Sequence, residues 1–341
     1  MLQPNRPVIQ TRPLRLKPGV DPKGAVVVLL GASSGVGRAA ALAFAKEGAH
    51  VVVAARRAEL LEEVRRECEA FGASALAVPT DATDAAAVKA LAEAAVGRFG
   101  RIDVWVNVVG VGAVGAFDET PIEAHEQVIK ANLLGHIHGA HAATPHFKAQ
   151  GRGVLININS VGAFAPAPYA VAYSASKFGL RGFSEALRGE LAPWSGIRVC
   201  DVFPTFLDTP GVGHGANYVG RELKPMPLVF DPNHVAKTLV TLARRPRKAR
   251  VLGWTASAIR VGHFLAPGPS VWAMGRYLEA WFRFARRAPI SDGAVFHPMA
   301  EGAGVHGGWK RPGLRAAVGI AAIGLVAFAG AAAFRRAASH A

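Results

Sequence analysis

The sequence predicts an α/β fold in which helices cover both faces of a doubly wound parallel sheet of about seven strands. Short apolar runs alternate with helical patterns through the first 250 residues, and such alternation is typical of parallel strands joined by crossover helices. A glycine-rich stretch, Gly31 to Gly37, also separates the first apolar run from the first helical segment. That order of strand, glycine turn and helix is typical of a phosphate-binding site.

The expected strands are short runs of apolar, mainly β-branched residues. They cover residues 25–30, 50–55, 73–79, 102–107, 153–159, 197–203 and 249–252. The expected helices cover 38–46, 59–71, 84–99, 122–150, 169–191 and a short segment after Asn233. The helix over 122–150 contains Gly135 and Pro145, so we expect interruptions there.

Within the glycine stretch, each glycine has a separate expected role. Gly31 permits a tight turn, Gly35 lets a ligand phosphate approach the backbone, and Gly37 lets the helix pack closely on the strand. The helix then presents free N–H groups to a pyrophosphate. The cofactor contacts expected from this turn are Gly31, Ser33, Ser34, Gly35, Val36 and Gly37.

The end of the second strand indicates which dinucleotide is bound. Folds that prefer NAD place an acid there for the ribose hydroxyls, whereas this chain has Arg56 and Arg57 after Ala55. An arginine pairs well with a 2′-phosphate, so NADP(H) is favoured over NAD(H). Arg38 is a further candidate for the same phosphate. Asp81 follows the third strand and is expected either to accept from an adenine amino group or to cap the next helix.

Tyr173 and Lys177 stand one helical turn apart and share a face of the helix. A neighbouring ammonium favours phenolate, so we expect Lys177 to lower the pKa of Tyr173 and to fit it for proton transfer. Ser160 ends the fifth strand and is expected to point into the crevice at the carboxyl ends of the strands. Its hydroxyl would hold a substrate oxygen as charge develops there.

These motifs together resemble the short-chain dehydrogenase/reductase family over about residues 24–255. The motifs are the glycine turn, Asn107-x-x-Gly110, Ser160, Tyr173-x-x-x-Lys177 and Pro204. The resemblance implies a Rossmann-type fold and hydride transfer between NADP(H) and a carbonyl/alcohol pair. It implies that Ser160, Tyr173 and Lys177 are catalytic, and that Lys177 also holds the nicotinamide ribose.

The resemblance also assigns supporting residues. Asn132 would hold a water of the proton relay. Asn107 and Gly110 would stabilise the central sheet beside the adenosine half, and Thr209, five residues after Pro204, would contact the nicotinamide side.

The chain departs from the family pattern in two places. Val108 and Val109 fill the segment between Asn107 and Gly110, where smaller and more polar residues are usual, so the adenosine pocket is expected to be altered. Thr205 follows Pro204 where the family has glycine. Because threonine does not readily adopt a positive φ, that loop is expected to follow another path.

Two segments, Val161–Ala172 and Phe206–Phe230, are expected to line the substrate cleft. Their apolar side chains fit a hydrophobic, lipid-like substrate, or pack on one another as a closed lid. His214 and Tyr218 are candidate polar contacts. No metal site is expected, because the histidines at 136, 138, 141 and 146 have no accompanying carboxylate or cysteine.

The composition narrows the functional class. The net charge is +15, which suits an anionic cofactor or an anionic membrane surface, while no nucleic-acid recognition module is present. Two cysteines form no disulfide framework.

The sequence predicts that the chain is divided into six segments. They are a basic arm (1–23), the NADP(H)-binding catalytic domain (24–255), an amphipathic helical extension (256–290), a Gly-rich linker (291–313), a transmembrane helix (314–334) and a short tail (335–341). The span is predicted from 19 uncharged residues between basic flanks, and a soluble helix packed on the body is the alternative. Residues 270–287 are expected to lie in a headgroup region, cover the cleft or form a dimer contact.

The leading interpretation is an NADP(H)-dependent oxidoreductase that acts on a hydrophobic substrate. Its catalytic domain would face the cytoplasm, held at the membrane by a single C-terminal helix, with homo-oligomer formation left open. The alternative is a catalytically silent NADP(H)-binding scaffold or sensor.

Overall fold

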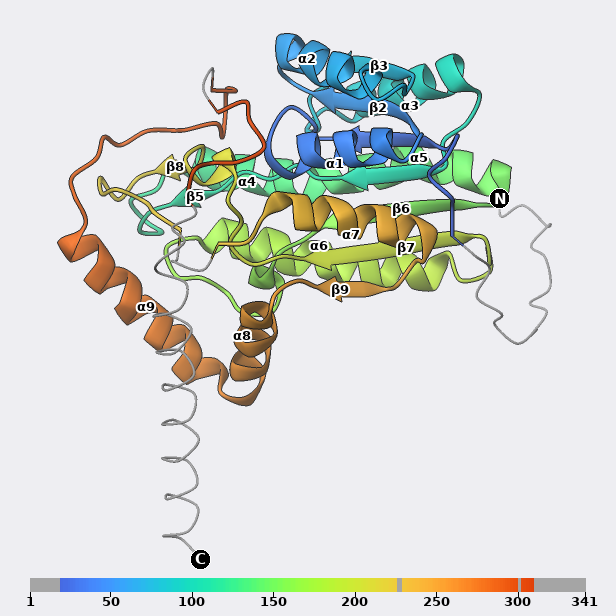
Figure 1. Cartoon of the computed structure of the whole chain (residues 1–341). Helices are drawn as coiled ribbons and strands as arrows, with labels where there is room; N and C mark the ends of the chain where they lie inside the picture. The colour runs from blue at the N-terminus through green and yellow to red at the C-terminus, as the bar shows by residue number, and fades with distance from the viewer. Residues whose placement is uncertain (1–18, 226–228, 300–301, 310–341) are drawn as a thin grey trace, which may run out of the picture.

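The computed structural model describes residues 19–225, 229–299 and 302–309. Within them, parallel strands form a seven-stranded sheet in the order β3-β2-β1-β4-β6-β7-β9 (Figure 1). The strands are β1 Val26–Leu30, β2 His50–Ala55, β3 Ala75–Pro79, β4 Val104–Asn107, β6 Gly153–Ile158, β7 Ile197–Phe203 and β9 Ala249–Val251. This order reverses direction at β1 and β4, so the predicted doubly wound α/β fold is confirmed.

Helices cover both faces of this sheet (Figure 1). They are α1 Gly35–Lys46, α2 Ala58–Glu69, α3 Ala85–Phe99, α4 Ile122–Ile129, α5 Gly135–Gln150, α6 Val171–Glu190 and α7 Pro232–Arg244. The α-helical run expected over 122–150 is interrupted before Gly135, as predicted, by a π turn at Lys130–Leu134 that joins α4 to α5. The second expected interruption is absent, because Pro145 lies inside α5 without ending it.

The core has two halves, one on each face of the sheet. Successive side chains of a strand point to opposite faces, so Val27 and Leu29 pack with α1, α2 and α7, whereas Val28 and Leu30 pack with α3 and α5. All four are fully buried. Burying each such side chain stabilises the fold by about 1.5–3 kcal/mol. Because the strands are parallel, their carboxyl ends all lie at one edge of this packed sheet.

A chain of buried polar groups crosses the sheet between β4 and β7. Asn107 donates to Asn157 Oδ1 (2.9 Å), Asn157 donates to Ser184 Oγ (3.0 Å), and Ser184 donates to Asp201 Oδ1 (2.7 Å). Arg188 ends the chain with an ion pair of 2.6 Å to Asp201. Burial raises the pKa of Asp201, while Arg188 and Ser184 oppose that rise.

Beyond the sheet lie two short strands and two further helices. The strands β5 (Ala113–Val114) and β8 (Ala216–Asn217) pair in parallel. The helices α8 (Trp254–Leu265) and α9 (Pro267–Phe284) stand apart from the sheet, and the chain after α9 returns past β5 and β8 (Figure 1). No residue of α9 is buried.

The predicted membrane span, 314–334, lies outside the described residues. None of the helices in the described ranges combines the length and the apolar character that a bilayer crossing needs. The structure therefore gives no support to the predicted anchor.

Candidate active site

The glycine turn has the geometry that its sequence predicts. Gly31 has a φ of 107° and Gly35 a φ of 54°, which is the left-handed region that glycine alone adopts without strain. A Cβ on Gly37 would lie 2.0 Å from the carbonyl oxygen of Gly31, so only glycine fits where α1 packs on the turn. The N-terminus of α1 therefore meets the carboxyl end of β1 at close range.

A cavity of about 250 Å³ lies against this turn. It brings together most of the residues predicted to bind the cofactor: Gly31, Ser33, Ser34, Gly35, Val36, Gly37, Arg56, Arg57, Asp81, Gly110 and Thr209. Thr209 lies across from the turn, because a Cβ on Gly35 would contact its side chain at 3.3 Å. Arg38, Asn107, Asn132, Pro204, Tyr173 and Lys177 do not line this cavity.

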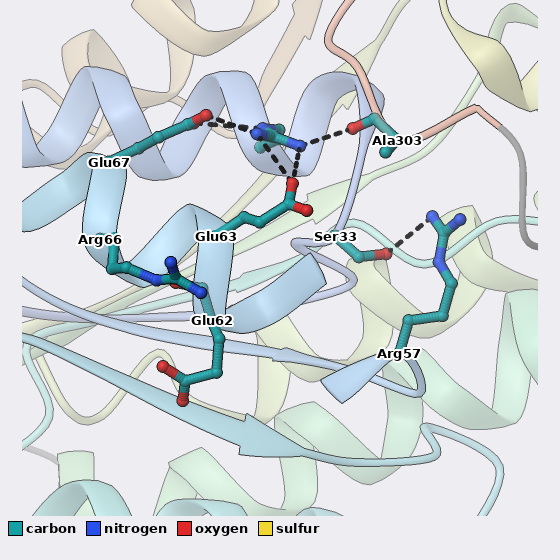
Figure 2. A network of polar contacts seen from close by, with 8 residues as sticks. Ser33, Arg57, Glu62, Glu63, Arg66, Glu67 and Ala303 are labelled. Atoms are coloured by element: carbon teal, nitrogen blue, oxygen red, sulfur yellow. Dashed lines mark hydrogen bonds and ion pairs between the residues drawn. The ribbon is translucent and has the colours of Figure 1, made fainter. Parts of the chain in front are cut away.

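Arg56 and Arg57 point along the cavity wall, but both already bind backbone carbonyls. Arg56 donates to the oxygens of Ala294 and Phe296, each at 2.9 Å. Arg57 donates to Met299 O (2.9 Å) and to Ser33 Oγ (3.2 Å), the latter visible in Figure 2. Burial, followed by repulsion from Arg56, lowers the pKa of Arg57.

Arg38 has a different setting from Arg56 and Arg57. Glu63 and Glu67 of α2 and the carbonyl of Ala303 converge on its guanidinium (Figure 2). The hydrogen bond with Glu67 is the main reason why the pKa of Arg38 is raised. Because two carboxylates already neutralise this cation, we leave Arg38 out of the proposed phosphate site.

Asp81 and Asp84 divide the two roles that the sequence left open for Asp81. Asp84 caps α3 by accepting from the N–H groups of Ala86 and Ala87. Asp81 instead accepts from the backbone and hydroxyl of Thr83, both at 2.8 Å, and lines the cavity.

Asn107 and Gly110 flank the two valines that depart from the family pattern. The Asn107 amide donates to Asn157 on β6 and to the His136 carbonyl on α5, so it ties three elements together. A Cβ on Gly31 would lie 2.9 Å from the backbone N of Val109. The valine backbone therefore packs against the glycine turn, and both valines line the cavity.

Ser160 and Tyr173 meet where β6 ends and α6 begins. The Ser160 hydroxyl accepts from the Gly162 N–H at 3.1 Å, which fixes the turn after β6. A Cβ on Gly162 would touch the Tyr173 ring at 3.3 Å and Ser160 Oγ at 3.4 Å, so this glycine gives the two side chains room to meet. Pro204 supports the same turn, since its carbonyl accepts from Val161 at 2.9 Å.

Lys177 lies one turn below Tyr173 and is 3% exposed. Its ammonium is 5.7 Å from the centre of the Tyr173 ring and donates to the Ile158 carbonyl at 3.4 Å. Burial lowers the pKa of Lys177 to about 8. The charge of this lysine therefore changes at a lower pH than that of an exposed lysine.

The expected lowering of the Tyr173 pKa is wrong for the chain by itself. Burial raises the pKa of Tyr173, and the hydrogen bond with Ser160 opposes that rise only in part. Sequence spacing identified the neighbouring cation correctly, but it carries no information on how far the phenol is desolvated.

Asn132 is fully buried in the π turn between α4 and α5. Its side chain accepts from Val111 N and donates to Val111 O, both at 2.8 Å. It also donates to Ser176 Oγ on α6 at 3.2 Å. The π turn thereby fastens the loop after β4 to the helix that carries Tyr173 and Lys177, as such turns often do at functional sites.

His136 on α5 is a buried titratable group for which the sequence predicted no role. It is fully buried, and burial together with the Lys177 charge holds its pKa well below the usual value. In the sequence, the signal for this burial was the spacing of four residues between His136 and Asn132. Among the described residues, no group of three or more His, Cys, Asp or Glu side chains is arranged to hold a metal ion.

The segments expected to line the substrate cleft largely pack on neighbouring elements. The rings of Phe164 and Phe203 are tilted at 45° to each other with their centres 4.6 Å apart. Tyr169 meets Phe282 of α9 edge-on, with the ring centres 5.2 Å apart. Thus α9 covers the loop after β6 from outside. Thr205 has an ordinary negative φ, since Tyr169 is the one non-glycine among the described residues with a positive φ.

The two candidate polar contacts have different positions. His214 lines the cofactor cavity, and its carbonyl accepts from Ala294 at 2.8 Å. Tyr218 donates to Asp292 at 2.7 Å, and burial with this carboxylate raises the pKa of Tyr218. Residues 226–228 of the second expected cleft segment lie outside the described residues.

Residues 294–299 and 302–309 form a segment, here called the strap, that was interpreted from sequence as part of a linker. Ala294, Val295, Pro298 and Met299 line the cofactor cavity. Its contacts run mainly through backbone carbonyls, which every residue type has, so the sequence offered no signal for them.

Comparison with known proteins decides the family. The family model for short chain dehydrogenases matches residues 25–216, which include the glycine turn, Ser160, Tyr173 and Lys177. The chain belongs to the short-chain dehydrogenase family. As an oxidoreductase of this family it binds a nicotinamide cofactor.

Similar proteins include two bacterial oxidoreductases and one archaeal structure. An uncharacterized oxidoreductase YxnA of Bacillus subtilis is 32% identical over 272 residues, covering 78% of this chain and 74% of that protein. A 3beta-hydroxysteroid dehydrogenase 1 of Eggerthella lenta is 36% identical over 230 residues, covering 65% and 88%. The chain spans about half or less of several other curated relatives.

The archaeal structure is an alcohol dehydrogenase from Thermococcus sibiricus complexed with 5-hydroxy-NADP. It is 25% identical, with a TM-score of 0.59, and the match covers 67% of this chain and 95% of that one.

Proposed function

We propose that this short-chain dehydrogenase uses NADP(H) to interconvert a carbonyl and an alcohol on a hydrophobic, lipid-like substrate. The observation that carries the proposal is the cluster of Ser160, Tyr173 and Lys177 at the carboxyl end of β6. The hydroxyl of Ser160, the phenol of Tyr173 and the ammonium of Lys177 all lie close to the turn that follows β6. The cofactor cavity lies at the same edge of the sheet.

A bound nicotinamide supplies or accepts the hydride. Tyr173 holds the proton that passes to the substrate oxygen in reduction and takes it back in oxidation. Ser160 donates to the same oxygen and steadies the charge that develops on it. Lys177, in its charged form, favours the phenolate that remains after the proton has left.

Asn132 is proposed to hold a water molecule that continues the proton path beyond Tyr173 and Lys177. Its bonds to Val111 and Ser176 leave it rigid and buried beside α6, where an amide can order a water molecule.

The preference for NADP(H) rests on Arg56 and Arg57. Both line the cavity beyond β2, and a 2′-phosphate would form charge-assisted bonds with their guanidinium groups in place of bonds to neutral carbonyls. The archaeal relative in complex with a modified NADP is in line with this preference.

The proposed substrate is apolar because Phe164, Tyr169 and Phe206 lie on the loops beside Ser160 and Tyr173. The hydroxysteroid dehydrogenase among the relatives acts on a substrate of this class by its name.

The decisive experiment is turnover of NADPH with a panel of lipophilic aldehydes and ketones. Tyr173→Phe should reduce kcat by at least ~100-fold, since it removes the transferred proton, while NADPH binding persists. Ser160→Ala should also lower kcat. Full activity in Tyr173→Phe would refute the proton path, and NADPH binding without any turnover in the natural chain would favour the scaffold interpretation.

We further propose that the enzyme is held at a membrane by residues 314–334, with the catalytic domain on the cytoplasmic side. Support comes from the apolar run itself and from exposed Phe264, Trp272 and Phe284 on α8 and α9. Fractionation of the full chain and of a chain ending at Leu314 tests this. If the full chain stays in the supernatant without detergent, the proposal fails.

A further inference from the structure

The strap binds the same groups that are proposed to bind the phosphates of the cofactor. Arg56 donates to Ala294 O and Phe296 O, and Arg57 donates to Met299 O. A carbonyl oxygen thus stands at each arginine where a phosphate oxygen is expected. A guanidinium has several N–H groups, so these contacts alone do not exclude a phosphate.

The contact at Gly35 is more restrictive. The backbone N–H of Gly35, in the first turn of α1, donates to Gly304 O at 3.0 Å. This N–H belongs to the helix terminus at which a pyrophosphate would bind. One N–H has a single hydrogen to donate, so Gly304 and a pyrophosphate oxygen compete for it.

The end of the strap is fastened on the other side of the cavity. Gly307 donates to Asp208 O at 3.1 Å, and the backbone N–H of Trp309 donates to Asp208 Oδ1 at 2.7 Å. The indole N–H of Trp309 donates to Thr209 O at 3.2 Å. The strap therefore bridges the glycine turn and the loop that carries Thr209.

The strap also limits the cofactor cavity, which measures about 250 Å³. Because Val295, Pro298 and Met299 form one wall, the cavity can enlarge if the strap moves outward.

We propose that the strap is an internal competitor of the cofactor, so that NADP(H) binds only after residues 302–309 have left Gly35 and Thr209. The inference rests on the proposed cofactor function. The free energy that holds the strap in place lowers cofactor affinity, and by linkage the bound cofactor releases the strap. The end of the chain is thereby coupled to the occupancy of the cofactor site.

The test weakens the strap without changing the phosphate ligands. A Cβ on Gly307 would lie 2.4 Å from Thr209 O and 2.5 Å from Trp309 Nε1, so Gly307→Ala should lift the strap from Thr209. Trp309→Ala removes the indole bond to the same carbonyl and gives a second, independent variant. Gly262→Ala is the control, because Gly262 on α8 has open space around it.

Cofactor affinity is measured on the full chain by titration calorimetry with NADPH and with NADH. Both strap variants should bind NADPH about 3–10-fold more tightly than the natural chain, the effect of one or two lost hydrogen bonds. NADH should gain by the same factor, since both cofactors need the Gly35 N–H. Gly262→Ala should stay within about two-fold.

Hydrogen exchange then reads the strap directly. NADPH should accelerate exchange of the amides in residues 302–309 of the natural chain. Unchanged or weaker NADPH binding in both strap variants, or slower exchange of the strap with NADPH, would overturn the competition. If the natural chain and all variants bind neither cofactor, the proposed function itself fails, and the exchange data without cofactor still report how firmly the strap is docked.

Discussion

At the scale of single residues, Lys177 has an environment far from its ordinary one. It is 3% exposed and its pKa is lowered to about 8, whereas the unfolded chain titrates near 10.5. Below pH 8 the folded protein bears the cost of a buried charge. Between pH 8 and 10.5 the unfolded state binds more protons than the folded state, so stability rises with pH there.

Lys177→Met should therefore stabilise the fold while it abolishes turnover. At pH 7 we expect the free energy of unfolding to rise by ~1–3 kcal/mol, because the buried charge is gone and the side chain keeps a similar volume. The gain should shrink as the pH rises from 8 to 10.5. Denaturant unfolding of cofactor-free protein at pH 7, 9 and 10 measures this, and a gain that grows with pH would contradict the assigned environment.

A second residue, Arg57, tests the cofactor preference. Arg57→Ala should weaken NADPH binding by about 10–100-fold, the value of a hydrogen bond to a charged group, and leave NADH within about two-fold. Arg66→Ala is the matched control, because its guanidinium lies on the exposed side of α2 and bonds to Glu62 O. Equal losses for NADPH and NADH in Arg57→Ala would argue against a 2′-phosphate at this site.

At the scale of elements, two helix glycines should respond in opposite directions to the same change. A Cβ on Gly139 of α5 would lie 2.1 Å from Asn107 Oδ1 and 2.7 Å from Trp105 Nε1, so α5 can approach β4 only through glycine. Gly97 of α3 has open space around it.

Gly139→Ala should lower the free energy of unfolding by about 1–3 kcal/mol through overpacking, and also by disturbing the Asn107 hydrogen bonds. Gly97→Ala should raise it by about 0.5–1 kcal/mol, the difference in helix propensity. Thermal unfolding of both variants checks the pair. Destabilisation of equal size in both would show that close approach of α5 and β4 is unimportant.

The elements also show where sequence reasoning succeeds. The strands of the sheet were placed within about two residues of their observed bounds, because buried parallel strands are apolar runs bounded by turns. The two-residue strands β5 and β8 were missed, since their pairing depends on tertiary contacts rather than on a pattern. An interruption near Gly135 was predicted, but the π geometry of Lys130–Leu134 was not, because a π turn has no distinctive composition.

For the site, too, some features were predicted from the sequence and others were not. Motif spacing brought Ser160, Tyr173 and Lys177 together correctly in space, and it gathered most of the cofactor residues around one cavity. It did not anticipate the pairing of Arg38 with Glu63 and Glu67, which depends on how α1 and α2 pack. The direction of the Tyr173 pKa shift was also beyond it, because burial is a property of the folded chain.

At the scale of the whole molecule, the sheet and the C-terminal helices differ in how firmly they are held. The strands β1 and β4 lie fully buried between two packed helix layers. In α9 no residue is buried, and Trp272 and Phe284 are 70% and 84% exposed. Local opening costs less free energy where few side chains are buried.

Hydrogen exchange should follow this difference. Amides of β1 and β4 should exchange only through global unfolding, and those of α9 at least ~10-fold faster through local opening. Mass spectrometry of the native protein at several pH values measures both. If α9 were as protected as β1, another molecule or a membrane would have to cover its exposed face.

The polar chain that begins at Asn107 and ends at Arg188 joins residues from four elements through shared hydrogen atoms. Replacing one member of this chain leaves a neighbouring polar group buried without a hydrogen-bond partner. Relatives that differ from this protein at one of these positions should therefore differ at its bonded neighbour too. Engineers who wish to redesign the interior of this sheet will have to exchange the set together.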